Sequence, residues 1–294
     1  MESRCQMTAS KALAQKADAH SVLIKPQRGL VGLDLGELFR FRELIFFLTW
    51  RDILVRYKQT LLGGTWAVIQ PLLQMFIFNV LFGDIAGLSS GGIPRPLFTY
   101  AALLPWNLFS SAIGEAGRSL VTNRNMITKV YFPRVVVPLS SVLSGVVDFA
   151  VAFVVLAGMM LYYGVLPTSG IWGLPFYLLL SLVTALGVGL WLAALNVHYR
   201  DVRHIIPFLT QFWMLATPIA YEANEIFDRL PQGFEWLYAL NPMVGVVEGF
   251  RHALVGTPIY STGLLWVSLI TSFVLLVSGL IYFRRMERTF ADVV

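Results

Sequence analysis

Six apolar stretches constrain the fold of this 294-residue sequence more than any other feature. A helix of about 20 residues crosses a hydrocarbon layer of about 30 Å, and most of these stretches reach that length. The sequence therefore predicts an all-α, polytopic membrane protein with six transmembrane helices. The stretches lie at 65–83, 97–117, 135–162, 174–197, 206–221 and 264–283.

The composition excludes several other classes of protein. A content of 56% hydrophobic and 13% charged residues is too apolar for a soluble domain of this length. The net charge of +5 could indicate a nucleic-acid partner, but the basic residues gather at the predicted membrane boundaries. We therefore expect no nucleic acid. The single cysteine, Cys5, and the four scattered histidines also predict no metal site.

The loops between the apolar stretches predict the orientation, because Lys and Arg remain preferentially on the cytoplasmic side. Nineteen of the 22 basic residues lie in alternate connections and at the two ends of the chain. Both termini are therefore predicted to be cytoplasmic, which agrees with an even number of crossings. The basic segments are 1–63, 118–134, 198–205 and 284–294.

The chain before the first span divides into two predicted parts. Residues 1–35 are mixed polar and are expected to form a mobile cytoplasmic tail rather than a signal peptide. Residues 36–62 predict an amphipathic helix in the cytoplasmic headgroup layer, followed by a break at Gly63 and Gly64. This interface helix could be a plain anchor or could also receive a partner. Its apolar face would carry Phe39, Phe46, Trp50, Ile53, Leu54, Tyr57 and Leu61, with Arg40, Arg51, Asp52, Arg56 and Lys58 away from it.

Polar residues inside the predicted spans are candidates for a substrate path. Gln70 and Gln74 share one helix face, which in lipid turns toward protein or a wet cavity. Contact between helices is the alternative reading. Asp148 lies near the centre of the third span, where an isolated charge costs about 3 kcal/mol. It must face a partner or water, or be protonated. Two roles remain open for Asp148: a polar residue on the substrate path, or a hydrogen bond to another helix.

The fifth span carries a stripe of hydroxyl groups and aromatic rings at a spacing of three to four residues. Such a face suits sugars, whose C–H faces lie against rings while their hydroxyls bind polar groups. Anchoring of the aromatic side chains at the membrane interface is the alternative. The stripe consists of Thr210, Trp213, Thr217 and Tyr221.

Two connections are predicted to contain short helices. The 118–134 loop has helical spacing and predicts a helix parallel to the membrane, with one face free for a soluble protein. A purely structural connector is the alternative. The 222–262 connection contains an apolar segment, 240–256, that Pro and Gly interrupt and that is too short to cross. A re-entrant pair of helices between spans 5 and 6 is expected there, covered by protein or water.

Several motifs in order resemble those of one family, from about residue 36 to the C-terminus. They are similar to the permeases of ABC-2 type ABC transporters that export polysaccharides such as O-antigen, capsule or teichoic acid. The motifs are Asp52–Gly63 entering Trp66 and Pro71, Ile127–Arg134, Tyr199–Val202 leading to Pro207, Thr217–Tyr221, and Asn241–Pro242 leading to Glu248–Arg251.

The resemblance implies a homodimer that works with two copies of a separate ATPase subunit and carries a lipid-linked polysaccharide across the bacterial cytoplasmic membrane. The transmembrane domain would span 63–283, with a cytoplasmic C-terminal tail at 284–294. The chain has no G-x-x-x-x-G-K-[ST] loop, so ATP and Mg would be held by the partner, with no cofactor in this chain. The 119–132 segment would be a coupling helix. Coupling residues would be Asn123, Arg124, Lys129, Arg134, Tyr199, Arg200 and Asp201.

Three alternative functions differ in the residues that they need. A membrane glycosyltransferase needs acids, bases or metal ligands that converge on one face. The acidic residues of the outer loop form no such constellation, so we expect no catalytic residues and no enzyme. A secondary transporter needs several ionisable groups at the midplane and a repeat. An ABC-2 drug or lipid exporter is the nearest alternative. The acidic residues of the outer loop, considered above for a glycosyltransferase, are Glu222, Glu225, Asp228 and Glu235.

Overall fold

The computed structural model describes residues 35–58, 64–223, 235–258, 262–287 and 289–290. Nearly all of the tail expected at 1–35 lies outside this range, as do Leu61, Gly63, Glu225 and Asp228. All regular elements in the described part are helices. In chain order they are α2 (Leu35–Arg40), α3 (Arg42–Lys58), α4 (Thr65–Phe78), the π-helix η1 (Asn79–Ile85), α5 (Arg95–Thr122), α6 (Arg124–Lys129), α7 (Val136–Tyr163), the 3-10 helix η2 (Ser169–Gly173), α8 (Leu174–His198), α9 (Val202–Leu215), α11 (Glu235–Ala239), α12 (Pro242–Val255) and α13 (Thr262–Met286).

Four helical segments within the described residues are long and apolar enough to cross a membrane. They match four of the six predicted stretches and are Thr65–Ile85, Val136–Tyr163, Ser169–His198 and Leu265–Met286. Of the other two stretches, 97–117 falls in α5, whereas 206–221 begins in α9 and continues past the end of that helix at Leu215. α5 has 28 residues but carries polar side chains, whereas α9 has only 14 residues, a length of about 21 Å. All-helical architecture is thus confirmed, and the count of six spans is not.

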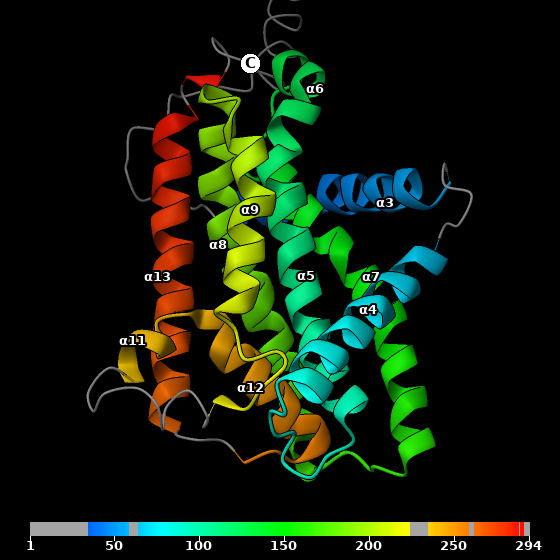
Figure 1. Cartoon of the computed structure of the whole chain (residues 1–294). Coiled ribbons are helices and arrows are strands. Elements are labelled where there is room, and N and C mark those ends of the chain that lie inside the picture. The colour runs from blue at the N-terminus through cyan, green and yellow to red at the C-terminus, as the bar shows by residue number, and fades with distance from the viewer. Residues whose placement is uncertain (1–34, 59–63, 224–234, 259–261, 288, 291–294) are drawn as a thin grey trace, which may run out of the picture. The chain divides into compact units, whose positions relative to one another are not determined.

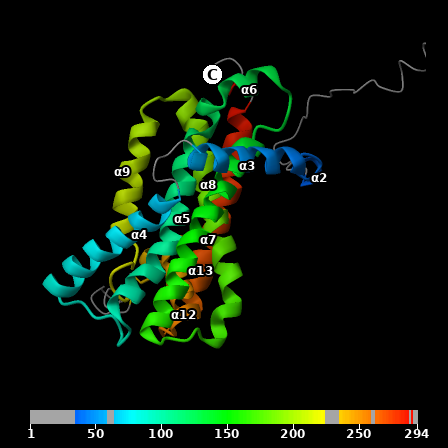
Figure 2. The ribbon, with the colours of Figure 1, turned by 90° about the vertical axis from the view of Figure 1, so that its right-hand side faces the viewer.

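α5 runs through the middle of the bundle, with α7, α8 and α9 beside it (Figures 1 and 2). Its side chains are buried along almost the whole helix, and the rings of Trp106 and Phe109 lie 5.5 Å apart in the core. Polar groups in a membrane protein turn toward protein rather than lipid. The least apolar of the long helices is accordingly the one that other helices surround.

α8 and α13 pack closely through small residues. A Cβ atom at Gly279 would lie 2.3 Å from the carbonyl oxygen of Gly187, so neither position accepts a side chain without movement. Thr184 donates a hydrogen bond to Ser272 Oγ at 2.8 Å across the same interface. Close backbone approach at small residues and interhelical hydrogen bonds are the usual means of helix association in lipid.

α3 lies across α7, nearly perpendicular to the upright helices (Figure 2). Phe46, Phe47 and Trp50 are exposed, as an interface helix requires, while Leu48 is buried against the bundle. The charged side chains of this helix differ from the sequence interpretation. Arg51 and Arg56, assigned to the side away from the apolar face, point at the bundle because they bind Asn123, just after α5, and Asp148 of α7. Asp52, assigned to the same side, binds Arg51 and lies 3.5 Å from Ser141 Oγ of α7.

The short helices lie at opposite ends of the bundle. α6, the turn between α8 and α9, and the last described residues lie at one end, and α11, α12 and η2 lie at the other (Figure 1). α6 covers Arg124–Lys129, shorter than the 119–132 helix expected, because α5 continues to Thr122. α12 begins where Asn241 Oδ1 accepts from Met243 N at 3.0 Å and ends at Gly256, whose φ is +75°.

Candidate functional site

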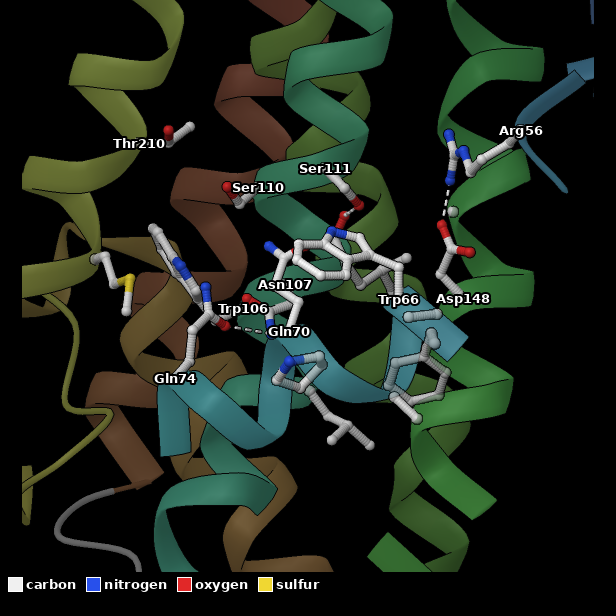
Figure 3. Close-up of a pocket in the computed structure, with 18 of the residues that line it drawn as sticks. Arg56, Trp66, Gln70, Gln74, Trp106, Asn107, Ser110, Ser111, Asp148 and Thr210 are labelled. Atoms are coloured by element: carbon white, nitrogen blue, oxygen red, sulfur yellow. Dashed lines mark hydrogen bonds and ion pairs between the residues drawn. The ribbon is translucent and has the colours of Figure 1, made fainter. Parts of the chain in front are cut away.

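A cavity of about 1070 Å³ opens between α4, α5, α7 and α9, beside the end of α3 (Figure 3). Half of the residues that line the cavity carry polar side chains, and the lining also contains indole and phenyl rings. The polar members are Arg56, Tyr57, Gln70, Gln74, Asn107, Ser110, Ser111, Asp148, Thr210 and Gln211. Trp66, Trp106 and Phe149 are the aromatic ones.

α4 and α5 form one wall of this cavity. Asn107 Nδ2 donates to Gln74 Oε1 at 2.9 Å, which fixes two amide groups side by side. Gln70 and Trp66 lie one and two turns before Gln74 on α4, and both are exposed. An indole ring next to amide groups can accept the apolar face of a sugar while the remaining donors and acceptors of the amides bind its hydroxyls.

Asp148 forms a charged corner at the junction of α3 and α7. One carboxylate oxygen accepts from the Arg56 guanidinium and the other from the Tyr57 hydroxyl (Figure 3 draws the first). Burial, together with the hydrogen bond to Asp148, raises the pKa of Tyr57, so this hydroxyl remains a donor at neutral pH. The side chains of Arg56 and Asp148 are 30% and 26% exposed. Asp148 thus has an interhelical partner and also faces the cavity.

The four residues of the stripe predicted in the fifth span are not brought together in the cavity, and only Thr210 and Trp213 lie in α9, because Thr217 and Tyr221 follow its end. Thr210 lines it, but Trp213 Nε1 donates to Asn241 Oδ1 at 2.7 Å and the Trp213 ring packs edge-on against Phe109. Thr217 is buried, and the Tyr221 hydroxyl lies 3.1 Å from that of Tyr238. Trp213, Thr217 and Tyr221 therefore hold α9 to the segment before α12. A role for them in a substrate path remains a prediction.

The predicted coupling residues gather at the end of the bundle that carries α6. Five of them are exposed, namely Arg124, Lys129, Tyr199, Arg200 and Asp201. The other two are engaged within the chain. Asn123 Oδ1 accepts from Arg51 Nη2 at 2.8 Å, and the backbone N–H of Arg134 donates to Glu287 Oε1 at 3.2 Å. The positions of these seven residues do not test whether any of them contacts another subunit.

Sequence reasoning missed the polar residues that α5 and α9 bring to the cavity. Asn107, Ser110 and Ser111 recur three and four residues apart, so they share a helix face within the predicted 97–117 span. That spacing is the signal that could have identified them. Gln211 follows Thr210, which was identified, and makes α9 the third helix, after α4 and α5, that brings an amide side chain to the lining.

Known proteins with similar sequences indicate the family of this chain. The family model for the ABC-2 type transporter matches residues 43–255. An O-antigen export system permease protein RfbA of Myxococcus xanthus is 32% identical over 73% of this chain and 81% of its own length. A protein of the same name in Klebsiella pneumoniae is 28% identical over 88% and 97%. The capsule polysaccharide export inner-membrane protein CtrC of Neisseria meningitidis is 23% identical over 86% and 95%.

Proposed function

This chain belongs to the ABC-2 type transporter family, and from that premise we propose that it is the permease subunit of an ABC exporter for a lipid-linked polysaccharide. It is a multi-pass protein of the bacterial cytoplasmic membrane. The relatives described above are named for O-antigen and capsule polysaccharide export, which supports this substrate class. ATP hydrolysis in a separate subunit drives the transport.

The observation that carries the substrate class is the match to permeases named for O-antigen and capsule polysaccharide export, and the lining of the cavity is compatible with it. Amides of Gln70, Gln74 and Asn107 and the indole of Trp66 offer what a carbohydrate chain needs, hydrogen-bonding groups next to flat apolar rings. An exporter of apolar drugs or lipids would need a wall dominated by hydrophobic side chains. The cavity wall is mixed, with polar and apolar side chains in equal number, so it is the export functions named for the relatives that favour a polysaccharide over that alternative.

We further propose a topology of six crossings, with α5 as the second and α9 as the fifth. Both termini and α6 are then cytoplasmic, and α11 with α12 forms a re-entrant pair near the outer surface. The polar character of α5 is compatible with a crossing because other helices surround it. The positions of the basic residues support this orientation.

The working unit is a homodimer of this chain with two ATPase subunits. The cavity is open rather than enclosed by one chain, and the exposed apolar residues of α4 leave a surface that a second copy can cover. The exposed charges of Arg124, Lys129 and Arg200 lie at one end of the bundle, where a soluble ATPase can reach them. The polymer passes between the two copies.

Deletion of the gene in its host tests this function. The cell surface should lose one polysaccharide, and the lipid-linked polymer should accumulate in the cytoplasm until the gene is restored. Normal surface polysaccharide in the deletion strain would overturn the proposal. A strain that becomes sensitive to toxic compounds while its glycans remain normal would point instead to a drug exporter.

A further inference from the structure

Phe290, the last described residue, is buried in the bundle. Phe290 is 0% exposed and its ring packs edge-on against Phe283, with centroids 5.3 Å apart. Chain ends are ordinarily poorly ordered unless something ties them down. Here Phe290 belongs to the core cluster that also contains Ile127 of α6.

The same segment binds the linker between α6 and α7. The Arg134 guanidinium donates to the backbone carbonyl of Glu287 and lies 5.9 Å from the centroid of the Phe290 ring. The Glu287 side chain accepts from the backbone N–H of Arg134 at 3.2 Å. Arg134 is thereby held by two groups of Glu287 and one ring, and it fixes the point at which the chain leaves α6 for α7.

A further contact joins this segment to the end of α8. The Thr289 hydroxyl lies 3.3 Å from His198 Nε2, and the His198 and Phe290 rings have centroids 6.4 Å apart. His198 is the last residue of α8 and precedes the exposed turn that contains Tyr199, Arg200 and Asp201. One short segment thus contacts both of the loops that are expected to meet the ATPase.

We propose that Glu287, Thr289 and Phe290 form a C-terminal clasp that holds the α6 loop and the α8–α9 turn in the relative position that the ATPase subunit recognises. This inference rests on the proposed function. The clasp residues are positioning residues, because they act through Arg134 and His198 rather than on the partner itself. A surface held in its binding arrangement before the partner arrives loses less conformational entropy on binding.

Removal of the Phe290 ring tests the clasp. Phe290→Ala should weaken binding of the ATPase subunit to the full-length permease in lipid nanodiscs by about fivefold or more. Phe290→Leu, which keeps an apolar side chain in the pocket, should restore most of the affinity. Phe250→Ala serves as the matched control, since Phe250 is equally buried in a cluster with α5 and α7 residues. It should lower the yield of protein without changing the affinity of the folded molecules.

A second pair of variants keeps the test decisive if Phe290→Ala does not fold. Glu287→Gln retains an oxygen that accepts from Arg134 N, whereas Glu287→Ala does not. The alanine variant should bind the ATPase subunit more weakly and the glutamine variant normally. Wild-type affinity in Glu287→Ala, or in Phe290→Ala where that variant folds, would overturn the clasp. If the unchanged permease binds no ATPase subunit, the proposed function itself fails.

Discussion

Arg51 of α3 reaches Asn123 at the start of α6, with Arg51 Nη2 2.8 Å from Asn123 Oδ1. One and a half turns further along the same helix, Arg56 and Tyr57 bind Asp148 in the cavity wall. α3 is therefore bonded at one point to the predicted coupling surface and at another to the cavity. If the ATPase docks on α6 as predicted, we expect a displacement of α6 to reach the cavity through this helix.

The first prediction concerns the Arg51–Asn123 contact. Arg51→Met should lower the number of polymers exported per ATP hydrolysed by roughly threefold to tenfold, because α6 loses its bond to α3. Arg42→Met is the control on the same helix, since Arg42 is exposed and stacks on Phe39. The measurement is export and ATP turnover in proteoliposomes with the ATPase subunit. Combination with Asn123→Ala should add little further loss; two fully additive losses would show that the pair is not coupled.

The second prediction concerns Asp148 and the stability of the fold. Asp148→Ala removes the acceptor for both Arg56 and Tyr57 and should cost about 1–3 kcal/mol, seen as a lower Tm of the purified protein. Asp148→Asn keeps an oxygen that can accept from the Tyr57 hydroxyl and should lose less. A Tm in Asp148→Ala equal to that of the unchanged protein would remove this contact from the forces that hold α3 on α7.

The third prediction concerns charge at the exposed end of the bundle. Lys129→Glu and Arg200→Glu should each reduce export driven by the ATPase while leaving membrane abundance and Tm unchanged, because both side chains are exposed. The matched variants Lys129→Arg and Arg200→Lys keep the charge and should remain close to normal. Unchanged coupling in the glutamate variants, measured in reconstituted vesicles, would exclude these residues from the partner interface.

The parts of the fold that depend on local pattern could be predicted from the sequence. Long apolar runs identified the helices at 65–85, 136–163, 169–198 and 265–286, because length and hydropathy alone define a span. Contacts between distant segments could not be predicted. Asp148 meets Arg56, 92 residues earlier, and no periodicity indicates that partner. The aromatic stripe on α9 likewise gave no sign that Trp213 bonds Asn241 rather than facing the cavity.

The fourth prediction separates residues that face the cavity from residues that hold α9. Gln70→Ala should slow export at normal membrane abundance, because Gln70 is exposed in the cavity wall. Trp213→Phe keeps the ring against Phe109 but loses the hydrogen bond to Asn241, so it should lower abundance and Tm, with an expected cost of about 1 kcal/mol. Export per folded molecule should then be nearly normal. Slow export at full abundance in Trp213→Phe would instead support a place in the substrate path.

The last prediction tests the contact between α8 and α13. Gly279→Ala places a Cβ atom 2.3 Å from the Gly187 carbonyl oxygen, and this atom belongs to the backbone of a packed helix, so α8 and α13 must separate. Overpacking of this kind costs about 1–3 kcal/mol, and we expect a clear loss of Tm and of folded protein. Gly158→Ala is the matched control, because Gly158 lies inside α7 and its Cβ atom would meet nothing within 4 Å. Alanine is favoured over glycine in a helix by about 0.5–1 kcal/mol, so Gly158→Ala should preserve or raise the Tm. Equal Tm values for the two variants would show that α8 and α13 do not approach each other this closely.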